Sequence, residues 1–310
     1  MRTYLDCYPC FLRQALDAAR KAGAGVEQQK AVLSRVLDVL REVEPSSTPP
    51  EIGYRVHRIV RHVVNDGDPY QAAKEASTHQ ALALYPRLKA LVAQADEPLD
   101  IAVRLSIAGN IIDLGPAQEY DLWSTVERVL AQSYAVDDRL ALRAALSIAG
   151  QVLYLADNAG ETVFDRLLIE TLDVPVTYAV KGGAVLNDAT REDALAAGVG
   201  RVAEIVDTGS DAPGTILDWC SEEFRHLYEG AELVVAKGQA NYETLSEEGP
   251  GVFFLLQAKC PIIARDVGVP VGSIVLKQGT TPGFQPDGGS HGNPCPTDKS
   301  DYTFQWEERK

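Results

Sequence analysis

The sequence has few basic residues for its length. Its 310 residues include 29 Lys and Arg against 44 Asp and Glu, which gives a formal net charge of −15 at pH 7. Domains that bind the phosphate backbone of nucleic acids normally carry a basic surplus or a basic stripe. The charge balance therefore argues against a nucleic-acid partner.

Long apolar runs and a cysteine framework are also absent. No apolar run reaches the roughly 18–20 residues needed to span a bilayer, and the first residues lack the charged and apolar segments of a secretory signal. Five cysteines are an odd number and too few for a disulfide scaffold in a chain of this length. With 45% hydrophobic and 24% charged residues, the composition is that of an ordinary globular protein. We therefore predict a cytoplasmic protein with no membrane partner.

Three common nucleotide and phosphate motifs are missing. No Gly-x-Gly-x-x-Gly follows the first predicted strand, so a dinucleotide or methyl-donor site of that type lacks its main signal. The P-loop pattern Gly-x-x-x-x-Gly-Lys-Ser/Thr does not occur. The first predicted strand ends in Asp157-Asn158 and lacks the Asp-x-Asp arrangement of aspartyl-phosphate phosphatases.

The chain from Tyr4 to about Arg143 has the hydrophobic spacing of helices. Between Phe11 and Ala19 apolar residues recur every three to four positions, as on one buried helix face. Segments 44–50 and 65–69 are rich in turn-forming residues and indicate loops. The same spacing predicts further helices over residues 32–40, 51–64, 70–84, 86–95, 99–107 and 120–131.

After Gly150 short apolar runs alternate with helical patterns. Strands that are apolar on both faces and separated by helices form a mostly parallel sheet in an α/β architecture. We divide the chain into a helical N-terminal domain (1–98), an α/β domain (99–279) and a Gly- and Pro-rich tail (280–310). The predicted strands cover residues 152–156, 174–180, 201–206, 232–236 and 252–257.

Polar side chains follow several of these strands. Asp157, Asn158 and Glu161 come after the first, Asp188 after the second and Lys237 after the fourth. Ligands of open α/β sheets bind beyond the carboxyl ends of the strands, and carboxylate and amide oxygens suit Mg²⁺ or Mn²⁺. Lys237, beside a glycine and a helix N-terminus, could hold an anion. A metal with an anion site indicates phosphoryl chemistry, although each loop alone could equally be a turn or a helix cap.

Two motifs of the helical part have more than one interpretation. Cys7-x-x-Cys10 could be half of a metal site or a redox couple, or two buried thiols on one helix face. Because the pair is far in sequence from the strand-end loops, we expect it to be structural or to lie at the domain interface, without a catalytic role. Gly109-Asn110-x-x-Asp113 is a polar break after an apolar helix, or only a helix C-cap.

Six motifs in order carry a resemblance to a known family. From about residue 2 to 277 the chain resembles the metal-dependent damage-control phosphatases, once catalogued as a domain of unknown function. The Cys-x-x-Cys start is similar to the branch found mainly in prokaryotes. The motifs are Asp6-Cys7-x-x-Cys10, Asp68-Pro69-Tyr70-x-x-x-Lys74, Gly109-Asn110-x-x-Asp113, Asp157-Asn158-Ala159-Gly160-Glu161, Asn187-Asp188 and Lys237-Gly238-Gln239-x-Asn241-x-Glu243.

The resemblance implies a helical N-terminal part on a Rossmann-like three-layer α/β/α core. It also implies a divalent metal (Mn²⁺, Mg²⁺, Ni²⁺ or Co²⁺) held by Asp157, Asn158 and Asp188. The implied reaction is the hydrolysis of phosphate monoesters, such as sugar phosphates and damaged phosphometabolites, so the expected partner is a small phosphorylated metabolite. The oligomeric state stays open.

From these motifs we assign roles to further residues. Lys237 joins the metal ligands as a catalytic residue that neutralises charge on the phosphate, and Glu161 caps the following helix. Substrate-binding residues are expected to be Asn110, Asp113, Glu161, Gly238 and Asn241. Two alternatives stay open: an S-adenosylmethionine-dependent carboxyl methyltransferase, which the family was once proposed to contain, and a non-enzymatic sugar-phosphate sensor.

Overall fold

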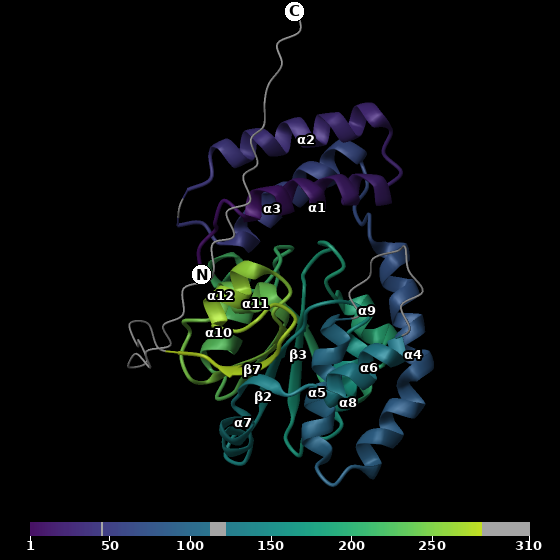
Figure 1. Ribbon diagram of the computed structural model, residues 1–310, viewed down its shortest axis with the longest axis vertical. Helices are drawn as coiled ribbons and strands as arrows, with labels where there is room; N and C mark the ends of the chain where they lie inside the picture. The colour runs from purple at the N-terminus through teal and green to yellow at the C-terminus, as the bar shows by residue number, and fades with distance from the viewer. Residues whose placement is uncertain (45, 112–121, 281–310) are drawn as a thin grey trace, which may run out of the picture.

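The computed structural model describes residues 1–44, 46–111 and 122–280 (Figure 1). Asp113 and nearly all of the predicted tail lie outside these residues. The chain begins with three helices, α1 (Cys7–Lys21), α2 (Val26–Arg41) and α3 (Pro49–Val64). They form a separate bundle at one end of the molecule (Figure 1), and their apolar faces share one hydrophobic core.

Local sequence explains where α3 begins and ends. Thr48 and Glu51 form a capping box around its first turn, and Pro49 occupies the first helical position, where no backbone N–H is needed. The helix stops at Asn65, which adopts a left-handed conformation with φ of 53°, a conformation that asparagine tolerates better than most residues. The predicted helix over 51–64 is therefore confirmed.

The second part of the molecule is a seven-stranded sheet in the order β1-β7-β6-β5-β2-β3-β4. The five strands from β6 to β4 run parallel, whereas β7 is antiparallel to β6 and β1 is parallel to β7. The mostly parallel sheet that we predicted is confirmed. The strands are β1 (Tyr134–Asp137), β2 (Val152–Leu155), β3 (Val176–Val180), β4 (Glu204–Asp207), β5 (Val234–Lys237), β6 (Val252–Gln257) and β7 (Ile274–Gln278).

Helices cover both faces of the sheet, which gives the three-layer arrangement (Figure 1). Val152 and Tyr154 of β2 pack into a core on one face, and Leu153 and Leu155 pack into a core on the other, as the alternation of side chains along a strand requires. The first face is covered by α4 (Gln71–Gln94), α5 (Pro98–Ile111), α6 (Leu122–Ala131) and α8 (Thr162–Ile169), and the second by α10 (Glu222–Glu229), α11 (Gly238–Leu245) and α12 (Pro261–Val267). Two further α-helices, α7 (Arg139–Leu146) and α9 (Arg191–Ala196), complete the set in the described residues.

Several predicted boundaries in the helical part are wrong. Residues 71–94 form one helix with Pro86 inside it, so the predicted break at this proline does not occur. The helix predicted over 99–107 continues to Ile111, so Asn110 is helical and does not follow a break. Strand β1 falls in a segment that we had assigned to helices. It is a four-residue strand at the sheet edge in which only alternate residues are partly buried. Such a short segment does not show the hydrophobic alternation of a strand clearly enough to predict it.

The bundle and the sheet meet at a polar joint. Lys74, buried in α4, pairs with Asp68 at 2.7 Å and with Asp193 of α9 at 3.0 Å. Arg61 of α3 pairs with Asp211 at 2.5 Å and donates to the carbonyl of Ala184. The residues of the Asp68–Lys74 motif therefore fasten the start of α4 to the α/β layers.

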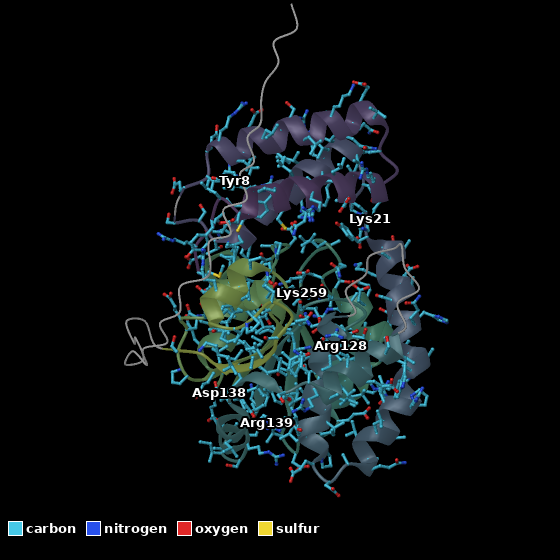
Figure 2. All side chains as sticks on the ribbon, viewed as in Figure 1. Tyr8, Lys21, Arg128, Asp138, Arg139 and Lys259 are labelled. Atoms are coloured by element: carbon cyan, nitrogen blue, oxygen red, sulfur yellow. The ribbon has the colours of Figure 1, made fainter. Side chains whose placement is uncertain are left out.

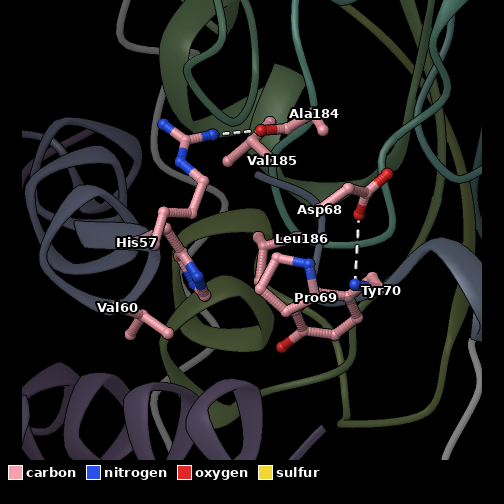
Figure 3. Close-up of a pocket in the computed structure, with 9 residues that line it drawn as sticks. His57, Val60, Asp68, Pro69, Tyr70, Ala184, Val185 and Leu186 are labelled. Atoms are coloured by element: carbon pink, nitrogen blue, oxygen red, sulfur yellow. Dashed lines mark hydrogen bonds between the residues drawn. The ribbon is translucent and has the colours of Figure 1, made fainter. Parts of the chain in front are cut away.

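A cavity of about 10 Å³ lies inside this joint (Figure 3), which is room for about one water molecule. His57 faces it, and burial together with the charge of Arg61 lowers the pKa of His57 to about 3. The imidazole is therefore neutral at physiological pH. The cavity is too small for a metabolite and belongs to the packing of the joint.

The packing places α4 with the sheet, since Ala81, Leu88 and Val92 belong to the core on the α5–α8 face. The predicted division at residues 98 and 99 stays a prediction. Within the described ranges, every helix is too short or too polar to cross a membrane.

Candidate active site

The candidate site lies at the carboxyl ends of three neighbouring strands. Strand β2 sits between β5 and β3 and is parallel to both, so the loops that follow these strands meet at one edge of the sheet. This order brings the Asp157-Asn158 loop beside the Asp188 loop and beside the start of α11. The juxtaposition is the one that the strand-end argument predicted.

Backbone hydrogen bonds hold two of these loops together. The N–H of Ala159 donates to the carbonyl of Asn187 at 2.9 Å, and the N–H of Ala189 donates to the carbonyl of Asp157 at 2.8 Å. Asn158 and Asp188 consequently form an isolated β-bridge. The three predicted metal ligands are therefore neighbours, and each is less than a tenth exposed.

The donor set suits a hard, partly hydrated divalent cation. Two carboxylates and one amide oxygen leave coordination positions for water and for a phosphate oxygen. Over the described ranges, no three His, Cys, Asp or Glu side chains are arranged to hold a metal ion. This edge of the sheet therefore has no closed metal site made of such side chains among the described residues. Asp157, Asn158 and Asp188 fit an open site of the Mg²⁺ or Mn²⁺ type.

Two asparagine side chains orient the carboxylate of Asp157. The Nδ2 of Asn110 donates to Asp157 Oδ2 at 2.7 Å, and the Nδ2 of Asn158 donates to the same oxygen at 2.9 Å. Both amides also donate to Glu161 Oε2 at 3.1 Å. Asn110 therefore acts on the site by positioning Asp157 and Glu161.

We expected the side chain of Glu161 to cap the following helix, and it does not. It occupies the N-cap position of α8, but its side chain makes no capping hydrogen bond. Instead it is buried and accepts from Asn110, Asn158 and Lys237. Burial raises its pKa, with Lys237 opposing the shift. The carboxyl is part of the buried support of the site, where unmatched charge is costly.

Lys237 lies beneath the carboxylates and not on an open surface. Its side chain is fully buried, and its ammonium donates to Glu161, to Asp165 at 2.6 Å and to the carbonyl of Ser106 at 3.0 Å. Desolvation alone would lower the pKa of Lys237, but Asp165 and Glu161 raise it above its ordinary value. An ammonium has three donors, and all three are used within the protein. We expected this ammonium to contact phosphate, but in the structure it contacts only groups of the protein among the described residues.

Asp165 is a member of this network that the sequence argument missed. It is fully buried and accepts from Ser106 at 3.0 Å, Tyr154 at 2.8 Å and Tyr178 at 2.7 Å, besides Lys237. The available signal was its position four residues after Glu161 on α8, which puts both carboxylates on one helix face. Residues of β2, β3, β5, α5 and α8 are thus joined under the predicted metal ligands.

Gly238 and Asn241 fix the position of the backbone at the start of α11. Gly238 has a φ of 79°, and an added Cβ would overlap the carboxylate of Asp157. Asn241 is fully buried; its Nδ2 donates to the carbonyls of Ala156 at 3.1 Å and Lys237 at 2.8 Å. Both residues let α11 start directly against the predicted metal ligands, whereas contact of either one with substrate stays a prediction.

Replacing Gly238 by alanine should therefore damage the site. We expect Gly238→Ala to lower metal affinity by about 10–100-fold, because Asp157 must move to make room. Gly23→Ala is the matched control: Gly23 also has a positive φ, 73°, but nothing lies within 4 Å of its added Cβ. Isothermal titration with Mn²⁺ would measure both. Equal metal affinity in the two variants would contradict the steric argument.

The three predicted metal ligands open onto a cleft of about 750 Å³ between the bundle and the α/β layers. Lys21 of α1 and Lys259, which follows β6, are the cations among the described residues that line it; both are labelled in Figure 2. Lys21 lies over the ring of Tyr70, 5.1 Å from its centroid. Neither lysine was predicted from the sequence, although Lys259 follows β6 just as Asp157 and Asn158 follow β2.

Glu243 of α11 is a buried carboxyl that lines the same cleft. The backbone carbonyl of Glu243 accepts from the amine of Met1 at 3.1 Å, and its side-chain Oε1 accepts from the Nε2 of Gln239 at 3.1 Å. Desolvation raises the pKa of Glu243 from 4.5 to about 7. The folded protein therefore holds this proton more tightly than the unfolded chain does.

This shift predicts a pH dependence of stability. Because the folded pKa is the higher one, the free energy of unfolding should fall as the pH rises from 4.5 to 7, by up to about 3 kcal/mol. Glu243→Gln should remove that loss, so the variant gains stability relative to wild type between pH 5 and pH 8. Urea unfolding at both pH values measures the difference. Glu247→Gln, at an exposed position on the same segment, is the control; equal behaviour of the two variants would refute the assignment.

Comparison with known proteins supplies further findings. A family model described as the damage-control phosphatase ARMT1-like domain matches residues 3–275. A damage-control phosphatase of Archaeoglobus fulgidus is 34% identical, covering 87% of this chain and 97% of its own length. Damage-control phosphatase PH1575 of Pyrococcus horikoshii is 31% identical, with coverages of 89% and 97%.

Two further matches extend over almost the same length. An uncharacterized protein, MJ0202, of Methanocaldococcus jannaschii is 35% identical over 87% of this chain and 93% of its own. The crystal structure of a DUF89 family protein from Pyrococcus horikoshii superimposes with a TM-score of 0.83 and 30% identity, covering 90% of this chain and all of the other. The fold and the sequence point to the same group of proteins.

Proposed function

This chain belongs to the damage-control phosphatase ARMT1-like family, and we propose that it is a divalent-metal-dependent phosphatase of small phosphorylated metabolites. Family membership supports phosphatase activity. The metal dependence and the substrate class, sugar phosphates or damaged phosphometabolites, are our proposal. The observation that carries it is the meeting of Asp157, Asn158 and Asp188 at the floor of the cleft.

A Mn²⁺, Mg²⁺, Ni²⁺ or Co²⁺ ion would be held by the carboxylates of Asp157 and Asp188 and by the amide oxygen of Asn158. When bound, such an ion polarises a phosphoryl oxygen and lowers the pKa of a coordinated water. Without a cation, two neighbouring carboxylates repel each other. Lys181 offsets part of this charge, since its ammonium lies 3.7 Å from Asp188 Oδ2.

The size of the cleft and two of its lysines suit a small anionic ester. The volume of about 750 Å³ lies within the range of small-molecule sites. Lys21 and Lys259 supply positive charge on opposite walls, so they can attract a phosphorylated ligand into an otherwise acidic protein. Asn110 keeps Asp157 oriented by a hydrogen bond that stays inside the protein. The bundle forms one wall and so limits the access of water to the reacting phosphate.

Turnover of p-nitrophenyl phosphate and a panel of sugar phosphates tests the proposal. We expect activity with added Mn²⁺, Co²⁺, Ni²⁺ or Mg²⁺ and none in EDTA. Asp157→Asn, purified in parallel, controls for contaminating phosphatases. Phosphate-ester binding without turnover would favour a sensor, and saturable binding of S-adenosylmethionine would favour a methyltransferase. Either result in place of turnover would refute the phosphatase assignment.

A further inference from the structure

Three thiols line the cleft from both of its walls. Cys7 and Cys10 lie in the first turn of α1, on the bundle side, and Cys260 is the N-cap residue of α12 on the other side. All three are free thiols. The fourth described cysteine, Cys220, is buried elsewhere, where its thiol donates to the carbonyl of Ile216 at 3.4 Å. The phosphatase chemistry above uses none of these sulfur atoms.

The spacing of Cys7 and Cys10 is suitable for a disulfide. Both residues are helical and three positions apart, and helix geometry puts their Cα atoms about 5 Å from each other. Native disulfides join Cα atoms that are about 4.4–6.8 Å apart. The first turn of α1 can therefore form this bond with little backbone movement.

The surroundings of Cys7 and Cys10 determine whether their thiols are protonated. Cys10 is exposed and Cys7 is half-buried. Desolvation raises the pKa of both thiols, and the neighbouring Cys260 and Glu243 add to the shift. The thiols are therefore protonated at neutral pH, which makes neither an activated nucleophile. Since the described residues contain no three-ligand metal group of Cys, His, Asp or Glu, a reaction between two thiols is the chemistry that this arrangement offers.

We propose that Cys7 and Cys10 form a reversible disulfide on the wall of the substrate cleft, with a small-molecule disulfide as the oxidant. The thiolate of one cysteine attacks the external disulfide and releases one external thiol. The second cysteine then loses its proton and attacks the mixed disulfide, which releases the other external thiol. Two protein thiols are oxidised to one disulfide, and one external disulfide is reduced to two thiols.

Formation of this bond alters the bundle side of the cleft. It draws the sulfur atoms of Cys7 and Cys10 together in the turn that follows Asp6, and this N-terminal segment is anchored to α11 by the bond between Met1 and Glu243. Asp157, Asn158 and Asp188 lie on the α/β side of the cleft. We therefore expect the oxidised protein to differ in KM more than in kcat, an effect that rests on the proposed phosphatase function.

The test uses the full-length chain with Cys295→Ser, which leaves four thiols. After treatment with hydroxyethyl disulfide at pH 8.5 and removal of the reagent, the thiol count should fall from four to two and the mass by about 2 Da. Peptide mapping should find Cys7 linked to Cys10, and dithiothreitol should reverse the change. KM for the best substrate of the panel should rise by at least about threefold upon oxidation.

Two variants make the assignment specific. Cys10→Ser cannot close the bond: Cys7 should at most be trapped as a mixed disulfide, so neither the loss of about 2 Da nor an internal link should appear. Cys220→Ser removes a buried thiol that does not line the cleft, so it should still lose two thiols and show the same rise in KM. Both variants should fold as wild type does, since a small polar group replaces a thiol in each.

Each remaining outcome contradicts a stated part of the proposal. An unchanged thiol count, a mixed disulfide that does not close, or a bond from α1 to Cys260 would overturn the Cys7–Cys10 pair. A closed disulfide that leaves KM unchanged would overturn its control of the cleft. The thiol count and the peptide map need no turnover, so they decide the pair even where the phosphatase proposal fails.

Discussion

Asp157→Asn and Asp188→Asn are each expected to lower kcat/KM by at least about 100-fold, the scale of removing one main electrostatic contributor to a transition state. Each change removes one of the two carboxylates that would hold the metal, while the amide keeps the size of the side chain. Metal content measured by elemental analysis should fall with activity. Because Asp157 and Asp188 come from different loops joined by a β-bridge, both losses together would support one shared site.

Asp207→Asn is the matched control. Asp207 also ends a parallel strand, β4, but it is exposed and pairs with Arg191 outside the cleft. We expect this variant to keep its activity and its metal. Near-native activity and metal content in both cleft variants would show that the metal assignment is wrong.

Lys237→Met is expected to cost about 3–5 kcal/mol of unfolding free energy, as is typical when one partner of a buried ion pair is removed. The change leaves Glu161 and Asp165 buried without their cation, and both are fully enclosed. Urea unfolding would measure the loss. This prediction differs from the expectation drawn from the sequence alone, in which Lys237 would serve mainly to bind phosphate.

A second substitution separates burial of charge from loss of packing. Asp165→Asn in the Lys237→Met background removes one of the stranded carboxylates, so the double variant should be more stable than Lys237→Met alone. Lys89→Met is the control: Lys89 forms an exposed pair with Glu170 at 2.7 Å, and such pairs contribute little. A loss at Lys237 no greater than the loss at Lys89 would contradict the buried network.

Much of the α/β part could be predicted from local patterns. Strands β2, β3, β5 and β6 are continuous apolar runs because both of their faces are covered by helices. Strands β1 and β7 could not be predicted in the same way. They occupy one edge of the sheet, where β7 is antiparallel to β6 and β1 pairs with β7. A sequence of four or five residues does not indicate which strand it pairs with or in which direction.

Local patterns also failed for the side chains around the metal ligands. Glu161 has the sequence position of a helix cap, and Lys237 has the position of an anion-binding lysine. Both are buried against each other because α5 and α8 cover the ends of β2 and β5. Whether a charged side chain is exposed or paired depends on which element lies above it, and that element can be distant in the chain.

The sequence by itself determined the family, the parallel sheet and the identity of Asp157, Asn158 and Asp188 as neighbouring donors. The ordered motifs carry the resemblance that names these three residues, and the strand ends bring them together once β2 and β3 are adjacent, because the carboxyl ends of adjacent parallel strands meet at one edge. Only the tertiary structure decided what faces them: the cleft wall with Lys21, the pair Cys7 and Cys10, and the buried network around Lys237. Those contacts depend on how the bundle docks on the sheet, which is set by packing between segments and not by any local pattern.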